Sequence, residues 1–319
     1  MRSASLTLLA VLLSPALPSA LIGQSPDTLA AHPPLIALPK LGGYLQVRES
    51  WQRGAGVSAV LNRARLSAEG SLPGHFAYRL MAEFAATSSS GPSGVSLRDA
   101  YLTWTRSALT VTAGQFKTPY SREYLTSLTM IETADRSAVV DGLATKRDIG
   151  LMAGYSFGTV AVLQAGLFNS EGQNSSGNRD SLLLGVGRLA MRVTPALTVA
   201  ANTARYADST RYGVDASVEL GRLVFRGEYH GQHRDAGGAD DQGWFVLGAV
   251  RVAPWIQLVI RQEDFQRPAI AATARNRATT LGSNFEFGAA RVRVLANYVS
   301  RRIGGTRRGS LVTQAQVRF

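Results

Sequence analysis

The stretch Ala290–Ser300 reads A-R-V-R-V-L-A-N-Y-V-S, and it decides between two folds for this chain. Side chains of a β-strand point alternately to opposite sides, so the two arginines share one face, and the two valines after them, Ala296 and Tyr298 share the other. A soluble protein buries such an apolar face in a core. A transmembrane barrel turns it toward lipid and keeps the polar face for a water-filled lumen. The rest of the sequence distinguishes these two folds.

Segments of the same kind recur from Lys40 to Phe319, in runs of about ten residues separated by turn residues, as is typical of transmembrane barrels. Tight links alternate with longer ones, which favours a barrel with short periplasmic turns over a β-sandwich. Phe319 ends the last run, a position typical of the assembly signal of outer-membrane barrels. We therefore predict an all-β, transmembrane antiparallel β-barrel of about sixteen strands, at residues 41–51, 58–69, 75–86, 95–105, 108–116, 148–156, 160–169, 180–193, 197–207, 212–220, 222–232, 242–252, 256–266, 278–287, 290–300 and 310–319.

The N-terminus has the layout of a secretory signal peptide. Arg2 precedes an apolar run, Leu6–Leu13, and prolines and small residues follow up to Ala20. The run is too short for a membrane anchor, which needs roughly 18 apolar residues. Cleavage after Ala20 or after Gly23 fits this layout. The predicted organisation is a signal peptide at 1–20, an N-terminal lead at 21–39 and a barrel at 40–319.

The charge balance favours anionic partners. The chain of 319 residues has 34 Lys+Arg against 22 Asp+Glu and a pI near 10.5, and only three of the basic residues are lysines. The charge is spread along strands, and no basic helix, RNA-binding motif or basic tail is present, so nucleic acid is not an expected partner. Since the chain has no cysteine, disulfides and thiolate metal sites are excluded, and we expect neither a metal nor a cofactor.

Arginine on the lipid side of a barrel strand costs roughly 2–4 kcal/mol at the bilayer midplane, so we assign the strand arginines to the lumen. Seven acids on the same faces leave an excess of five positive charges, and a cationic pore favours anions. The alternative is that each arginine pairs with an acid and only solvates the wall. The predicted lumen wall contains Arg48, Arg63, Arg65, Arg79, Arg188, Arg192, Arg222, Arg226, Arg261, Arg291, Arg293 and Arg318.

Residues 117–147 form a predicted link far longer than an ordinary connection, and links of this length are usually functional or disordered. Its apolar residues, among them Ile131, Val139 and Leu143, argue against disorder. It is the third of the predicted longer links, and in general porins the third outer loop folds into the barrel and narrows it. We therefore expect 117–147 to be an inward-folded constriction loop.

The sequence G-Q-F-K-T-P-Y-S-R-E-Y-L-T-S at 114–127, with I-E-T-A-D-R-S at 131–137, resembles the phosphate-selective porin O/P family. S-L-R-D-A-Y-L-T-W at 96–104 is a weaker match to it. The resemblance implies a trimeric outer-membrane channel whose inward loop and arginine-lined wall select phosphate or related anions. The phosphate-specific members use a cluster of lysines, whereas arginine binds phosphate through its forked donors. The resemblance implies a constriction with the candidate anion-binding residues Lys117, Arg122, Lys146 and Arg147.

Together these features predict a porin of the bacterial cell outer membrane, an anion-preferring channel for passive diffusion of phosphate or similar small anions. The expected partners are small anions, outer-membrane lipid and lipopolysaccharide, and two further copies in a homotrimer. A general non-specific porin and a plugged structural or adhesive barrel are the alternatives. We do not expect an enzyme, because the four histidines, His32, His75, His230 and His233, offer no paired base and nucleophile.

Overall fold

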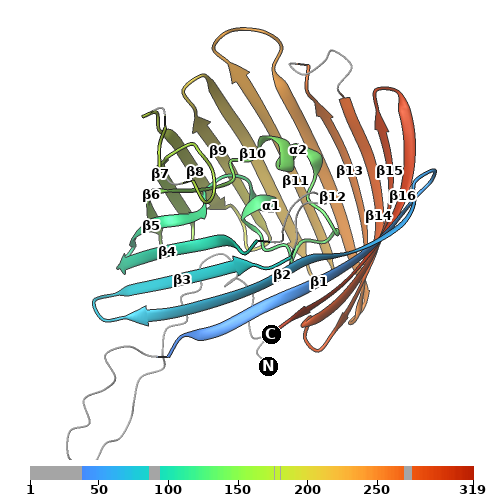
Figure 1. Cartoon of the computed structure of the whole chain (residues 1–319), viewed down its shortest axis with the longest axis horizontal. Coiled ribbons are helices and arrows are strands. Elements are labelled where there is room, and N and C mark those ends of the chain that lie inside the picture. The colour runs from blue at the N-terminus through green and yellow to red at the C-terminus, as the bar shows by residue number, and fades with distance from the viewer. Residues whose placement is uncertain (1–37, 86–93, 176, 180, 269–274) are drawn as a thin grey trace, which may run out of the picture. The chain divides into compact units, whose positions relative to one another are not determined.

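The chain forms a closed barrel in the computed structural model, which describes residues 38–85, 94–175, 177–179, 181–268 and 275–319. Each strand pairs antiparallel with its neighbour in sequence, and β1 pairs with β16 to close the sheet (Figure 1). The expected signal peptide and most of the N-terminal lead lie outside the described residues. The strands are β1 (Lys40–Gln52), β2 (Gly56–Leu72), β3 (Phe76–Glu83), β4 (Ser96–Arg106), β5 (Leu109–Lys117), β6 (Arg147–Phe157), β7 (Ala161–Phe168), β8 (Leu184–Arg192), β9 (Leu197–Arg205), β10 (Ser209–Leu220), β11 (Leu223–Arg234), β12 (Asp241–Ala253), β13 (Ile256–Gln266), β14 (Arg275–Phe287), β15 (Val292–Ile303) and β16 (Thr306–Arg318).

The sixteen-stranded antiparallel barrel confirms the predicted fold class, and every predicted strand overlaps an observed one. The ends differ most in the last hairpin, where a long link was expected at 301–309. There β15 and β16 continue to a turn at 304–305, because Arg301 pairs with Arg308 and Arg302 with Arg307 across the ladder. The alternation of short and long links is therefore less regular than the sequence suggested.

The two faces of the strands differ as a barrel in lipid requires. On β15, Arg293, Leu295 and Asn297 are buried on the inner face, whereas Val292 and Tyr298 on the outer face are 39% and 46% exposed. Exposed large apolar side chains would cost free energy in water, and lipid removes that cost. None of the helices in the described part of the chain is long and apolar enough to cross a membrane.

Two β-bulges change which side chains reach the lumen. On β2, Asn62 is an extra residue between the paired residues Leu61 and Arg63, and on β4 Arg98 is an extra residue between Leu97 and Asp99. A bulge breaks the alternation of a strand and re-aims the neighbouring side chains. Both bulges lie in the wall that faces the candidate site described below.

The lipid-facing assignment predicts the effect of a charge on the outer wall. Ile260, halfway along β13, is 53% exposed on the outer face. Ile260→Arg is expected to destabilise the folded barrel by about 2–4 kcal/mol, because arginine is then held near the bilayer midplane. Urea unfolding of the protein in lipid vesicles measures this loss. Gln262→Arg, two residues nearer the strand end on the same face, is the control and is expected to cost less, because the penalty falls toward the interface; equal losses contradict the assignment.

Candidate functional site

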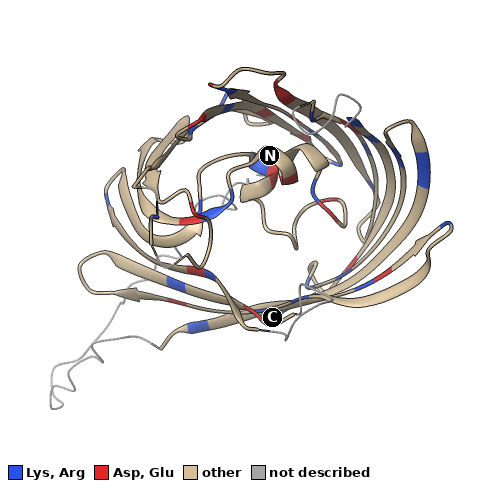
Figure 2. Cartoon of the chain, turned by 45° about the horizontal axis from the view of Figure 1, so that its top comes forward, with Lys and Arg blue, Asp and Glu red and all other residues tan. Residues whose placement is uncertain are grey.

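The connection between β5 and β6 contains two short helices, α1 (Arg122–Leu125) and α2 (Ala138–Leu143), which lie inside the ring of strands (Figure 2). Each begins at a serine that caps it. The Ser121 hydroxyl accepts from the Tyr124 N–H, and the Ser137 hydroxyl accepts from the Val140 N–H. Such caps satisfy backbone donors that a helix start leaves free, so these short helices can form within a long connection.

Glu228, on the inner face of β11, binds the start of α1. Its carboxylate accepts hydrogen bonds from the backbone N–H of Glu123 (2.5 Å) and the hydroxyl of Ser121 (2.6 Å), and His230 Nε2 lies 2.7 Å from it. The Asn202 side-chain oxygen on β9 accepts from the backbone N–H of Ser121 (3.2 Å). All five residues are buried. The wall therefore holds α1 through hydrogen bonds that lie out of contact with solvent.

Apolar contacts hold α2 against β11, β12 and β13. Val139 and Leu143 are fully buried in one apolar cluster with Phe265 of β13. A Cβ atom at Gly142 would lie 2.5 Å from the ring of Phe265, so only glycine allows this close approach. The apolar residues that argued against disorder in this segment are thus its packing contacts.

The middle of the connection is bound by another part of the wall. Arg293 on β15 and Gln316 on β16 donate to the carbonyl oxygen of Thr129, at 2.7 Å and 2.9 Å. The Asn297 side-chain oxygen accepts from the backbone N–H of Ala134 at 2.7 Å. Residues 118–146 are therefore fixed on at least two sides of the lumen, which is what a stable constriction requires.

Glu132 joins this connection to β11 from a buried position. Its carboxylate lies 2.7 Å from the guanidinium of Arg226, and Arg122, Arg293 and Glu219 also act on it. Burial raises the pKa of Glu132 to about 7, since loss of water disfavours the carboxylate more than the arginines favour it. A group of this kind makes the position of the connection depend on pH.

The sign of that dependence follows from the raised pKa. Glu132 holds its proton more tightly when the connection is bound to the wall than when it is released. The contribution of protonated Glu132 to binding of the connection is therefore fully present at pH 4 and is lost as pH rises through about 7. Burial raises the pKa of Glu123 to about 7 as well, and its effect adds to this. Open-channel current noise is therefore expected to be larger at pH 8 than at pH 5. Glu132→Gln is expected to reduce the difference; an unchanged difference contradicts the role given to Glu132.

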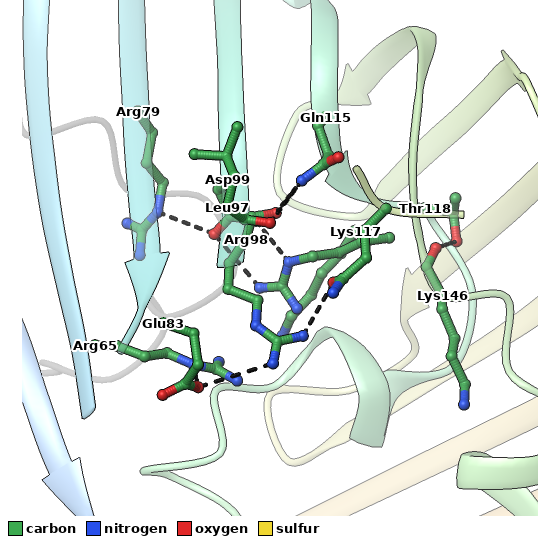
Figure 3. Close-up of polar contacts among 12 residues, drawn as sticks. Arg65, Arg79, Glu83, Leu97, Arg98, Asp99, Gln115, Lys117, Thr118 and Lys146 are labelled. Carbon is green, nitrogen blue, oxygen red and sulfur yellow. Dashed lines mark hydrogen bonds and ion pairs between the residues drawn. The ribbon is translucent and has the colours of Figure 1, made fainter. Parts of the chain in front are cut away.

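Six cationic side chains gather between the connection and the wall of β2 to β6, and we call them the constriction cluster. Figure 3 shows Arg65, Arg98 and Lys117 among them. Lys117 interacts electrostatically with Arg65, Arg136 and Arg147, and Arg65 also interacts with Arg63. The cluster combines strand residues with one residue of the connection. Its members are Arg63, Arg65, Arg98, Lys117, Arg136 and Arg147.

Two of these arginines share one carboxylate. Arg65 Nε lies 2.6 Å from Glu83, and the Arg98 guanidinium lies 3.9 Å from the same carboxylate. Arg65 is also placed over the ring of Tyr44, 5.5 Å from its centroid. A single negative charge therefore holds two guanidinium groups in place and neutralises only one of them.

Asp99 is shared in the same way. Arg147 Nε donates to it at 2.8 Å, and Arg79 Nε lies 3.4 Å away (Figure 3). Arg79 is also paired with Glu69. Since Asp99 follows the bulge residue Arg98, the same irregularity of β4 supplies one cation and one carboxylate to the site.

Lys117 and Arg136 bind the end of α1. The Lys117 ammonium donates to the carbonyl oxygens of Tyr124, Leu125 and Thr126, at 2.8, 2.9 and 3.1 Å. Arg136 donates to the carbonyls of Tyr124 and Thr126, and both cations lie over the Tyr124 ring, at 5.5 Å and 4.7 Å from its centroid. Cations at a helix C-terminus stabilise it. All three ammonium N–H donors of Lys117 are used, so it offers no free donor to an anion.

Arg63 is a strand residue of the cluster without an acidic partner. Its guanidinium donates to the side-chain oxygen of Gln46 at 2.8 Å, and within the described ranges no carboxylate lies at ion-pair distance from it. Within the described residues, the carboxylates at ion-pair distance from the six cations are Glu83 and Asp99, so cations outnumber acids at this range. Anions entering this part of the lumen meet a net attractive potential.

The four anion-binding residues expected from the family resemblance lie in different parts of the structure. Lys117 and Arg147 belong to the constriction cluster. Arg122, the first residue of α1, lies 3.8 Å from Glu219 on β10. Lys146 is exposed, and its side chain extends away from Lys117 (Figure 3). Sequence spacing alone did not separate these two environments.

Two of the twelve arginines predicted to line the wall lie in turns instead. Arg222 and Arg291 are exposed in the tight turns at 221–222 and 288–291, because β11 starts only at Leu223 and β15 at Val292. The prediction that these two line the wall is wrong. The other ten lie on strands: Arg48, Arg63, Arg65, Arg79, Arg188, Arg192, Arg226, Arg261, Arg293 and Arg318.

Several of those ten are already engaged by the wall or by the connection. Arg188 lies 2.5 Å from Asp215, and Arg261 donates to the Thr133 hydroxyl at 2.8 Å and to the Asp135 carbonyl at 2.8 Å. Both arginines are almost fully buried. Arg188 thus pairs with an acid within the wall, and Arg261 binds the connection.

Sequence reasoning missed Arg98 and Arg136. Arg136 lies inside the quoted motif I-E-T-A-D-R-S, so a signal for it was present. Strict alternation places Arg98 and Asp99 on opposite faces, and only the bulge brings both into the lumen network. Nothing in the sequence marks that bulge.

Comparison with known proteins adds three findings. Residues 51–204 match the model of a family described as phosphate-selective porin O and P. No curated protein sequence matches the chain. Among solved structures, the fold is similar to the outer-membrane channel DcaP of Acinetobacter baumannii (TM-score 0.67, 13% identity, 88% of this chain and 97% of that one), an anion-selective porin from Comamonas acidovorans (0.65, 15%, 88% and 99%) and OmpT of Vibrio cholerae in a trimer form (0.64, 13%, 88% and 99%).

Proposed function

Since the chain is a member of the phosphate-selective porin O and P family, matched over residues 51–204, we propose that it forms a water-filled, anion-preferring channel in the bacterial outer membrane. Small anions such as phosphate diffuse through it passively. The family and the barrel are those of outer-membrane channel proteins. The anion preference and the residues that produce it are the part that experiment has to establish.

The constriction cluster is the observation that carries this proposal. Six cations face two shared carboxylates where the connection approaches β2 to β6, so a fixed positive charge stays in the lumen. Arginine predominates there, and its planar fork suits phosphate and carboxylate oxygens. Shared carboxylates and backbone carbonyls hold the cations in position, so little conformational entropy is lost when an anion passes.

A general, non-specific porin is the second candidate. Lys117 is the one lysine of the cluster, and three carbonyl oxygens occupy its donors. A site with charge but few free donors attracts anions of many kinds and recognises none of them closely. This geometry supports anion preference more strongly than phosphate specificity.

We also propose a homotrimer with its outer wall in contact with lipid and lipopolysaccharide. The similar OmpT barrel is described in a trimer form. The outer face carries large apolar side chains along the strands, among them Leu45, Leu163, Val246 and Ile260. Such a wall suits both lipid and the wall of a second copy.

The proposal assigns no reaction to the chain. Ser121, Glu228 and His230 are hydrogen-bonded in series, but all three are buried beneath α1 and serve as its anchor. Within the described ranges, no group of three or more His, Cys, Asp or Glu side chains is placed to hold a metal ion.

Reversal potentials in a planar bilayer under a KCl gradient test the function. An anion-preferring pore is expected, and its chloride current is expected to fall as phosphate is added if phosphate binds in the lumen. Chloride current that phosphate leaves unchanged identifies the non-specific porin. A cation-preferring pore contradicts the proposal, and the absence of any pore identifies a plugged barrel.

A further inference from the structure

Three arginines lie side by side across the end of the sheet, on neighbouring strands. Arg277 of β14 is directly opposite Arg302 of β15, which is directly opposite Arg307 of β16. On the other side, Arg277 is opposite Asp264 of β13. Like charges directly opposite each other destabilise a strand pair, so this row needs a counter-charge.

The row lies on the outer face of the barrel. On β14, Ala278 and Thr280 are buried inside, so Arg277 points outward, and Asp264 faces it from β13. By the same alternation Arg302 and Arg307 point outward, and Arg307 donates to the outward Ser300 at 2.9 Å. We call Arg277, Arg302 and Arg307 the outer arginine row.

Asp264, at the β13 end of the outer arginine row, already has two arginine partners. Asp264 accepts from Arg277 at 3.0 Å and from Arg275 at 2.5 Å, which leaves a positive excess. Within the described residues, no carboxylate lies at ion-pair distance from Arg302 or Arg307. Both are exposed. The row therefore offers guanidinium donors to a partner outside the chain.

The level of the row on the wall identifies that partner. A rank of apolar side chains lies four residues farther along the same strands from the outer arginine row. Its members are opposite one another and 43–53% exposed: Ile260, Leu281, Tyr298, Leu311 and Trp51. Four residues of strand span about 14 Å, and less in height because barrel strands tilt. The arginines thus lie roughly 11 Å above the rank that contains Ile260, at the upper rim of the apolar wall. Lipid head groups occupy that level of a membrane.

We propose that the outer arginine row binds the phosphate groups of lipopolysaccharide in the outer leaflet. Phosphate accepts from the forked donors of two neighbouring guanidinium groups, and its charge offsets their repulsion along the row. The acyl chains then lie along the apolar rank below. The inference rests on the proposed outer-membrane location and deepens it, and it is independent of anion selectivity.

The last hairpin supplies its own matched control. Arg301 and Arg308 are opposite each other on the same two strands, one residue away from Arg302 and Arg307, and they point to the inner face. Arg302→Gln/Arg307→Gln and Arg301→Gln/Arg308→Gln therefore remove the same charge from the same hairpin on opposite faces. Binding of hexa-acylated, bis-phosphorylated lipid A to each purified protein in detergent, measured by native mass spectrometry, compares them.

The outward double variant is expected to bind this lipid A roughly twenty-fold more weakly, since each arginine near an anionic surface contributes about five-fold. The inward variant is expected to bind as the parent does, and dephosphorylated lipid A is expected to show no difference among the three proteins. Equal losses in both variants, or none, overturn the proposal. Loss of the oligomer in the outward variant alone also overturns it, because the row then belongs to an interface between copies.

The same proteins separate this inference from the proposed function. Reversal potentials of the outward variant are expected to match the parent. If lipid A binding is lost in that variant while the parent pore proves to prefer cations, the proposed function fails and the outer arginine row keeps its role. Heat-modified mobility on a gel shows that each variant has folded as a barrel before binding is measured.

Discussion

Arg63→Glu is expected to lower the ratio of anion to cation permeability about tenfold. The wall charge changes by two units, and each unit contributes roughly 0.35 kcal/mol in water to an ion about 12 Å away. The anion loses this contribution twice and the cation gains it twice, so the ratio changes by about 1.4 kcal/mol. Arg63 is suited to this test because its hydrogen-bond partner is the side-chain amide of Gln46, and no carboxylate at ion-pair distance loses its counter-ion when the arginine is removed. Reversal potentials under a KCl gradient measure the ratio.

Arg222→Glu is the matched control for that experiment. It makes the same change of charge in an exposed turn, at 221–222, away from the constriction cluster. Its reversal potential is expected to stay close to that of the parent protein. A similar shift in both variants means that net charge alone sets the selectivity, and the site assigned to β2–β6 and the connection then has no special role.

Removing the Glu228 carboxylate is expected to free the α1 end of the connection. In Glu228→Ala the N–H of Glu123, the Ser121 hydroxyl and His230 all lose their acceptor. Each buried group left without a partner costs about 1–3 kcal/mol, so the bound position loses about 3 kcal/mol or more. Single-channel conductance is expected to rise and fluctuate, and liposomes are expected to swell faster in solutions of larger sugars.

Glu69→Ala provides the comparison for Glu228→Ala. Glu69 is also a carboxylate of the inner wall. Its ion-pair and hydrogen-bond partner is Arg79 of the neighbouring strand, which does not belong to residues 118–146. Its conductance is expected to remain steady. If Glu228→Ala behaves in the same way, the hydrogen bonds at α1 do not hold the connection, and the apolar contacts of α2 suffice.

The strands were predictable because their alternation follows from backbone geometry. Inner and outer neighbours on β15, such as Arg293 and Val294, differ in polarity wherever one side faces lipid and the other faces the lumen. The alternation failed at β4, where Arg98 is an extra residue and both it and Asp99 reach the lumen network. A bulge depends on the pairing of two strands, so the local sequence of β4 does not predict it.

The long connection was predictable in length and not in its contacts. Its apolar residues indicated packing, but the partners of Lys117 come from backbone carbonyls of α1 that only the folded chain brings near. For the same reason the wall arginines could not be sorted in advance. Whether Arg261 meets an ion or the connection depends on where residues 133–136 lie.

The shared carboxylates bear on how fast ions leave. Glu83 and Asp99 lie beside Arg65, Arg98 and Arg147, so a permeating anion competes with them for the same guanidinium donors. Each carboxylate thus shortens the residence time of a permeating anion at these arginines. Conduction needs binding that is weak enough to release the ion. Such a lumen binds anions more weakly but passes them faster, and its sites do not saturate when the solute is abundant.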